Sequence, residues 1–120
     1  MALVFLIKSE AMGLHLVGYF LPVLMAASAL PMVLRKVPPN LIYGFRTPKT
    51  LSSPEVWYVA NRIAGWFMIA GAALALCHNF ALWSMHADWP WDRLVVYMAV
   101  ADLIAVMLAS AASSLYLRKL

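Results

Sequence analysis

Three long apolar stretches, at about residues 11–34, 63–82 and 94–117, constrain the fold of this chain more than any other feature of its sequence. They contain no Lys, Arg or Glu, and only the third contains an acidic residue, Asp102. About 20 mostly apolar residues cross a bilayer as a helix, which satisfies its own backbone hydrogen bonds there. The sequence therefore predicts an all-α membrane protein with three transmembrane helices.

The composition supports this prediction, because 65% of the residues are hydrophobic and only 12% are charged. Soluble domains are about 45–50% apolar and about 25% charged. A soluble globular domain and a disordered chain are thereby excluded, and residues 1–120 are expected to form a single domain. Residues 1–7 are interpreted as an interfacial lead-in to the first helix, in which Pro22 and Pro31 predict a kink.

The basic residues predict the orientation of the chain in the membrane. Segment 35–62 and the C-terminus hold seven of the nine Lys and Arg residues: Arg35, Lys36, Arg46, Lys49, Arg62, Arg118 and Lys119. Basic residues gather on the cytoplasmic side, so we expect the N-terminus outside and the C-terminus inside. The net charge of +4 is then a sign of topology, and nucleic-acid binding is not expected. Aromatic belts are expected at both interfaces, with Trp57, Tyr58 and Tyr116 at the inner one.

Segment 35–62, between the first two apolar stretches, is far longer than a simple connection requires. Pro38-Pro39-Asn40 and Gly44 predict turns in its first half. Its second half predicts a helix start, either with Ser52 as N-cap and Glu55 reaching back, or with Ser53 as N-cap and Pro54 as the first helical residue. We therefore expect a structured cytoplasmic loop between helices 1 and 2.

This segment also carries a family resemblance. The string P-P-N-x-x-Y-G-F-R-T-P-K-T-L-S-S-P-E-V-W-Y-x-A-N-R-x-x-G, at Pro38 to Gly65, resembles the signature of the SdpI family. These are small integral membrane proteins of the bacterial inner membrane, named for an immunity protein against a secreted toxin. The resemblance implies an immunity or signalling role through binding of a toxin or a cytoplasmic partner. The name-giving member has further spans before the shared unit.

The loop supplies one set of candidate partner- or anion-binding residues: Asn40, Tyr43, Gly44, Arg46, Thr47, Lys49, Thr50, Ser52, Trp57, Asn61 and Arg62. Arg46 and Lys49 lie near a helix N-terminus, an arrangement that attracts anions. Contact with anionic lipid and an Arg46–Glu55 salt bridge are the alternatives. Trp57 and Asn61 form either a recognition face or packing contacts, and Asn40 and Gly44 are typical of turns.

A second set lies inside the bilayer: Asp102, His15, His78 and Asn79. An acid at this depth is a candidate functional residue, as a proton relay or cation site. The alternative is a protonated Asp102 that hydrogen-bonds to a neighbouring helix. Two histidines without further ligands are a weak metal signal, so no metal or cofactor is predicted. Small residues at four-residue spacing, such as Ala105 and Ala109, permit close helix contacts within the chain or in a homo-oligomer.

Several functions remain open at this stage. The leading expectation is a non-enzymatic membrane protein that binds a toxin or a protein partner and contacts membrane lipids. The alternative is a small accessory subunit that stabilises a larger membrane complex. A minimal transporter built on Asp102 is a third reading. An enzyme is not expected, since the sequence offers no nucleophile–base arrangement and no phosphate-binding loop.

Overall fold

The computed structural model describes the backbone of residues 2–120 and the side chains of residues 2–3 and 16–120. Three long helices make up most of this part of the chain: α1 (Ala2–Val33), α2 (Pro54–Met85) and α3 (Trp91–Leu117). A short 3₁₀ helix, η1 (Thr50–Ser52), lies in the connection between α1 and α2. No strand occurs among these residues, so the described chain is all-helical.

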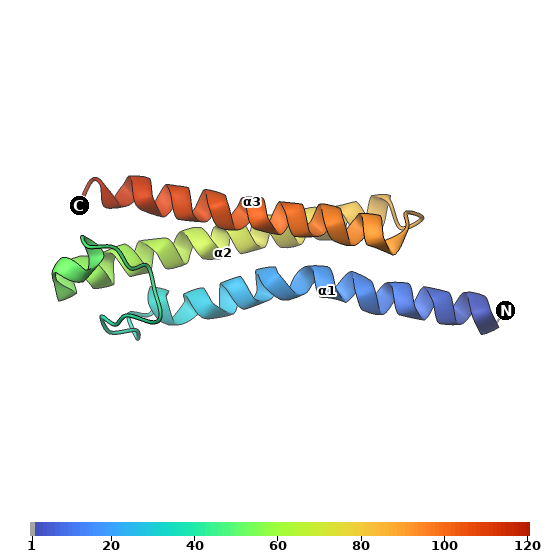
Figure 1. Ribbon diagram of the computed structural model, residues 1–120, viewed down its shortest axis with the longest axis horizontal. Helices are drawn as coiled ribbons and strands as arrows, with labels where there is room; N and C mark the ends of the chain where they lie inside the picture. The colour runs from blue at the N-terminus through green and yellow to red at the C-terminus, as the bar shows by residue number, and fades with distance from the viewer. Residues whose placement is uncertain (1) are drawn as a thin grey trace.

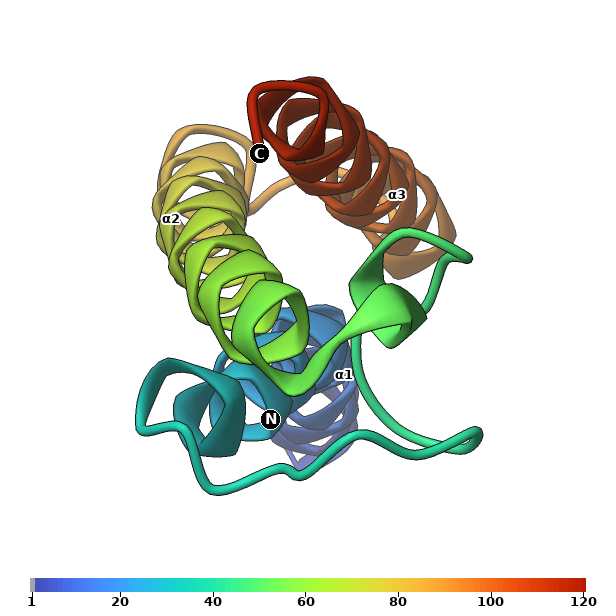
Figure 2. The same ribbon diagram turned by 90° about the vertical axis from the view of Figure 1, so that its left-hand side faces the viewer.

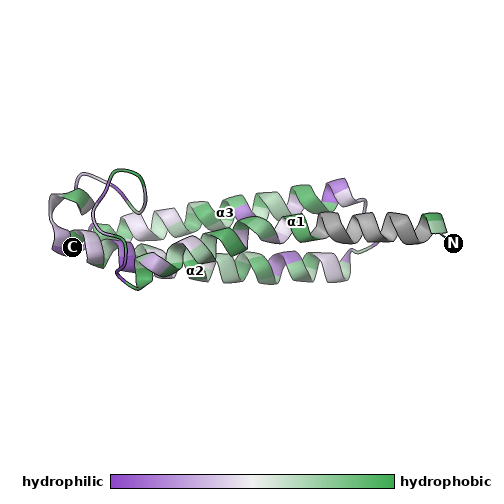
Figure 3. Cartoon of the chain, turned by 90° about the horizontal axis from the view of Figure 1, so that it is seen from below, coloured by the Kyte–Doolittle hydropathy of each residue, from purple (hydrophilic) through white to green (hydrophobic). Residues whose placement is uncertain are grey.

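Consecutive helices run antiparallel along one long axis, and the molecule measures 63 × 22 × 18 Å (Figure 1). All three are long and apolar enough to cross a membrane. Loop 34–53 and the C-terminus lie together at one end, and the N-terminus lies at the other (Figure 1). In the coloured part of the cartoon, polar colours concentrate at the loop end and near the α2–α3 turn, while much of the helices between them is green, the colour of apolar residues (Figure 3).

Each helix begins before the apolar stretch that predicts it. The first helix begins at Ala2, so the stretch interpreted as a lead-in belongs to the helix itself. The second begins at Pro54, ahead of the apolar stretch, where Ser53 caps it and accepts a hydrogen bond from Val56 N at 3.2 Å. This is the second of the two predicted helix starts. The third helix begins at Trp91, directly after Pro90.

The first helix ends where Arg35 adopts a left-handed conformation with φ 58°. The Lys36 N–H then donates to the Pro31 carbonyl over 2.9 Å, which closes the last turn of the helix. The chain reverses at this point and enters the loop. Both internal prolines remain within α1, so neither ends it.

Small residues form much of the contact between the helices. The predicted rows are buried at Ala60, Ala64, Ala75, Ala105, Ala109 and Ser113. A side chain added at Gly71 would lie 3.2 Å from the Ala105 carbonyl oxygen, so α2 and α3 approach each other with no room for a larger residue. The rows therefore pack helix against helix within one chain.

Candidate functional site

Two clusters of polar side chains make up the candidate site, one in the loop and one inside the helical bundle. The loop cluster begins at Asn40. Its Oδ1 atom accepts hydrogen bonds from Ile42 N at 2.8 Å and Tyr43 N at 2.7 Å, and its Nδ2 atom donates to the Pro38 and Tyr43 carbonyls. This is a turn built by an asparagine side chain. Burial beside it raises the pKa of the Tyr43 phenol above its ordinary value.

Asn61 and Trp57 hold the next part of the loop against α2. Asn61 Oδ1 accepts from Phe45 N at 2.6 Å, and its Nδ2 donates to the Phe45 carbonyl at 3.3 Å. Trp57 Nε1 donates to the Val37 carbonyl at 2.8 Å. Gly44 has φ 119°, and a Cβ atom there would lie 2.7 Å from Asn61 Oδ1. Only glycine fits this conformation and this close approach.

The burial of Trp57 corrects the prediction that places it in an interfacial aromatic belt. The side chain has no exposed surface and packs against Met32, Val37 and Ala64. The loop folds back over the face of α2 that carries Trp57, a contact that hydropathy along the chain does not reveal. Trp57 and Asn61 share one face of α2, as predicted, and this face holds the loop.

Thr47 and Thr50 bind each other through a reciprocal set of hydrogen bonds. Thr47 N donates to Thr50 Oγ1 at 2.7 Å, and Thr50 N donates to Thr47 Oγ1 at 3.1 Å. Thr50 is fully buried, and its hydroxyl also donates to the Thr47 carbonyl. Ser52 Oγ donates to the Lys49 carbonyl at 2.5 Å. These hydroxyls shape the loop and η1.

The two cations of the predicted anion site donate to backbone carbonyls. Lys49 Nζ donates to the Leu117 carbonyl at 2.8 Å, which ties the loop to the C-terminal end of α3. Arg46 donates to the Leu41 carbonyl. Within the described part of the chain, Arg46 forms no ion pair with Glu55, so the predicted salt bridge is absent from this structure. Arg62 is exposed on α2.

The second cluster joins all three helices around Asn79. Its Nδ2 atom donates to the Gly18 carbonyl of α1 at 2.8 Å and to Asp102 Oδ1 of α3 at 2.9 Å. Asn79 is fully buried and Asp102 is 4% exposed. His78 Nδ1 lies 3.1 Å from Asn79 Oδ1, and the side chain of His15 lies outside the described residues. Among the side chains that the structure describes, no group of three or more His, Cys, Asp and Glu residues could hold a metal ion.

The Gly18 carbonyl needs a donor because of a proline. In an α-helix it would accept from the N–H of residue 22, but Pro22 has none. Asn79 supplies the missing hydrogen bond from the neighbouring helix, as membrane interiors require. Sequence reasoning named Asn79 and Asp102 as possible partners and missed Gly18. The proline itself is the signal that could have found it.

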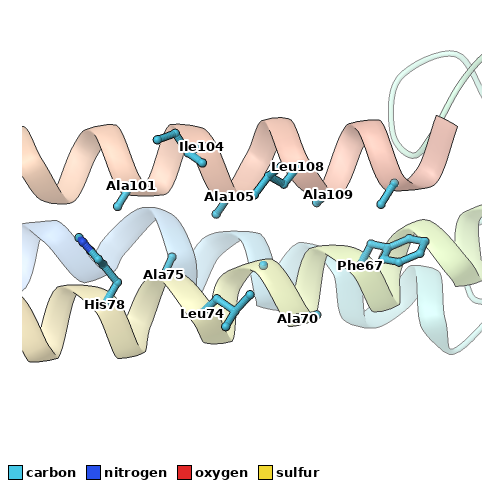
Figure 4. Close-up of a pocket in the computed structure, with 12 residues that line it drawn as sticks. Phe67, Ala70, Leu74, Ala75, His78, Ala101, Ile104, Ala105, Leu108 and Ala109 are labelled. Atoms are coloured by element: carbon cyan, nitrogen blue, oxygen red, sulfur yellow. The ribbon is translucent and has the colours of Figure 1, made fainter. Parts of the chain in front are cut away.

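A groove of about 440 Å³ runs between α2 and α3, and one end of it lies beside the Asn79 cluster (Figure 4). Its walls are small and apolar side chains, with Phe67 toward one end and His78 at the other (Figure 4). A second, smaller hollow of about 220 Å³ lies beneath the loop, where Tyr43, Gly44 and Phe45 face Ser28 and Ser113. Of these two hollows, the first is formed by two helices and the second by helices and loop together.

Comparison with known proteins gives one match. The profile of the SdpI/YfhL protein family matches residues 36–114, which includes most of the loop, all of α2 and most of α3. The polar side chains of both clusters that the structure describes fall in this range, whereas two of their acceptors, the carbonyls of Gly18 and Leu117, lie outside it. No curated protein and no solved structure matches the chain significantly.

Proposed function

The chain belongs to the SdpI/YfhL protein family, and we propose that it acts by binding rather than by catalysis, as an immunity or signalling protein of the bacterial inner membrane. The observation that carries the proposal is the loop, which is hydrogen-bonded to α2 and α3. Such a surface is organised before a partner arrives, which lowers the entropy lost on binding.

We propose that the loop end faces the cytoplasm and binds an acidic protein partner there. Seven basic residues lie at this end, against one acidic residue, Glu55. At the opposite end Asp88 lies in the α2–α3 turn, and Asp92 and Arg93 lie in the first turn of α3. This asymmetry supports the orientation by the positive-inside rule and favours a partner of opposite charge.

Purification of the tagged protein from native membranes in mild detergent tests this proposal. We expect a protein partner to be recovered with the wild-type chain and with Arg93→Gln, and to be reduced with Arg62→Gln. Both arginines are exposed, but only Arg62 is at the loop end. Equal recovery with both variants would contradict binding at this end. A toxin-immunity role further requires that deletion of the gene makes cells toxin-sensitive.

The groove between α2 and α3 favours a second candidate function, that of an accessory subunit in a larger membrane complex. Small residues at a groove allow a further transmembrane helix to approach closely. Ala70 lines this groove, whereas Ala73 is also exposed on α2 but does not line it. If the groove holds a partner helix, Ala70→Phe releases the complex and Ala73→Phe does not. Retention of the complex in both variants would exclude this role for the groove.

A further inference from the structure

The tip of the loop, formed by Leu41 and Ile42, is the most exposed apolar feature of the described structure. The two side chains are 76% and 88% exposed, more than any other large hydrophobic residue described. Neither faces the helical bundle. Two adjacent apolar residues fully exposed to water would be unfavourable by about 1.5–3 kcal/mol each relative to burial.

The exposure of this tip is built into the loop. Asn40 fixes the turn by accepting hydrogen bonds from the backbone N–H groups of Ile42 and Tyr43. Arg46 donates to the Leu41 carbonyl from the other side. The tip is therefore held in one conformation by its own neighbours, so the apolar side chains cannot turn inward without breaking these hydrogen bonds.

The direction of the loop indicates what it contacts. It leaves the end of α1 and extends sideways past that helix rather than along the long axis of the bundle (Figures 1 and 2). Seen from below, the apex of the loop is green and stands beside the helices (Figure 3). A projection along the axis would enter the aqueous phase. A sideways projection at the end of a membrane-spanning helix meets the boundary between headgroups and acyl chains.

The charge around the tip fits the same surroundings. Arg35, Lys36 and Arg46 are exposed, and residues 34–53 contain no acidic residue. A basic side chain near an anionic membrane surface contributes about 1 kcal/mol. Apolar residues flanked by cations are typical of segments that lie in the membrane interface.

We propose that Leu41 and Ile42 insert into the leaflet at the loop end, while Arg35, Lys36 and Arg46 contact the phosphates of anionic lipids. The loop is then attached to the bilayer at its tip and to the helices through Trp57, Asn61 and Lys49. This role is independent of the proposed protein partner and of which side of the membrane the loop faces.

Spin-label accessibility in vesicles tests the insertion. A label is attached at Ile42→Cys in a Cys77→Ala background, and the matched control carries it at Ser52→Cys, an exposed position of η1. In phosphatidylcholine vesicles containing phosphatidylglycerol, the label at 42 should collide mainly with oxygen. The label at 52 should collide severalfold more with the neutral water-soluble complex nickel ethylenediaminediacetate. Equal nickel accessibility at both positions overturns the proposal and assigns the tip to a soluble partner instead.

Two further measurements separate the label's own affinity for lipid from that of the loop. Adding Leu41→Gln should raise the nickel accessibility at position 42 severalfold, because half of the apolar tip is removed. An unchanged value would show that only the label inserts, and this overturns the proposal. Omitting phosphatidylglycerol, or adding Arg35→Gln with Lys36→Gln, should also raise the nickel accessibility at position 42. Insensitivity to both changes overturns the proposed phosphate contacts, and circular dichroism confirms that each variant keeps its helices.

Discussion

The two buried asparagines of α2 perform different tasks with the same side chain. Asn61 and Asn79 are 18 residues apart, which is five helical turns, so they lie on one face of α2. Asn61 holds a single residue of the loop, Phe45, by hydrogen bonds to both the backbone N–H and the backbone carbonyl of Phe45. Asn79 connects α1 and α3, through the Gly18 carbonyl and the Asp102 carboxyl group.

The difference lies in what replaces each contact when it is lost. The loop is at the end of the bundle, where water can reach the freed Phe45 groups once the loop opens. Gly18 and Asp102 lie in membrane-spanning helices, where no water is at hand to replace a missing donor. Asn61 therefore controls a local opening, whereas Asn79 contributes to the assembly of the whole bundle.

Asn79→Leu should therefore have the largest effect, a loss of about 2–3 kcal/mol in the free energy of unfolding. It leaves the Gly18 carbonyl and Asp102 without their donor. Equilibrium unfolding in mixed micelles measures the loss. Pro22→Ala is the matched background, because residue 22 then has an N–H for the Gly18 carbonyl. Asn79→Leu should cost about 1 kcal/mol less there, and an equal cost in both backgrounds would refute the role of Pro22.

Asn61→Ala should cost about 1–2 kcal/mol, and its effect should be confined to the loop. Hydrogen exchange measured by mass spectrometry should rise for the segment around Phe45, whose N–H loses its acceptor. The segment around Asn79 should keep its protection. Faster exchange along the whole of α2 would contradict the distinction between the two asparagines.

Gly44→Ala should cost about 1–2 kcal/mol, because alanine is strained at φ 119° and its Cβ would crowd Asn61 Oδ1. The effects of Gly44→Ala and Asn61→Ala should not add, since both release the same loop segment. A double-mutant cycle on the free energy of unfolding checks this, and additivity would show that the two residues act separately.

Lys49→Met should cost about 0.5 kcal/mol, the size of a single cation at a helix C-terminus. It removes the hydrogen bond to the Leu117 carbonyl and should raise hydrogen exchange at residues 118–120. Lys36→Met serves as the control because Lys36 is also an exposed loop lysine. The same rise in both variants would mean that Lys49 does not hold α3.

Asp102→Asn should have the smallest effect, within about 0.5 kcal/mol, because the new amide oxygen still accepts from Asn79. The cellular function should also survive. Loss of function without loss of stability would favour the transporter reading, in which the carboxyl group itself carries a proton or cation. A proton-flux assay in vesicles distinguishes the two outcomes.

The sequence predicted the helices well because their signal is local and strong. Three apolar runs marked the helices, and Ser53 with Pro54 marked the start of α2. Asn40 and Gly44 were predicted as turn residues, and both lie in turns: Gly44 through its φ of 119°, and Asn40 through the hydrogen bonds of its side chain. Each of these predictions depends on residues close together along the chain.

The contacts that could not be predicted from the sequence join side chains to backbone carbonyls far away along the chain. Trp57 binds Val37, Asn79 binds Gly18 and Lys49 binds Leu117, across 20, 61 and 68 residues respectively. A carbonyl is the same in every residue, so no residue type marks these acceptors in the sequence. For the same reason, the burial of Trp57 and the hydrogen bond from Lys49 to the end of α3 could be found only in the structure.

Pro22 in α1 has a consequence for how the protein is made. During synthesis α1 emerges first, and the Gly18 carbonyl has no donor within that helix. Its partner, Asn79, is translated 61 residues later. The first helix therefore enters the bilayer with the Gly18 carbonyl still unpaired, and this carbonyl gains its donor only when the second helix arrives beside it.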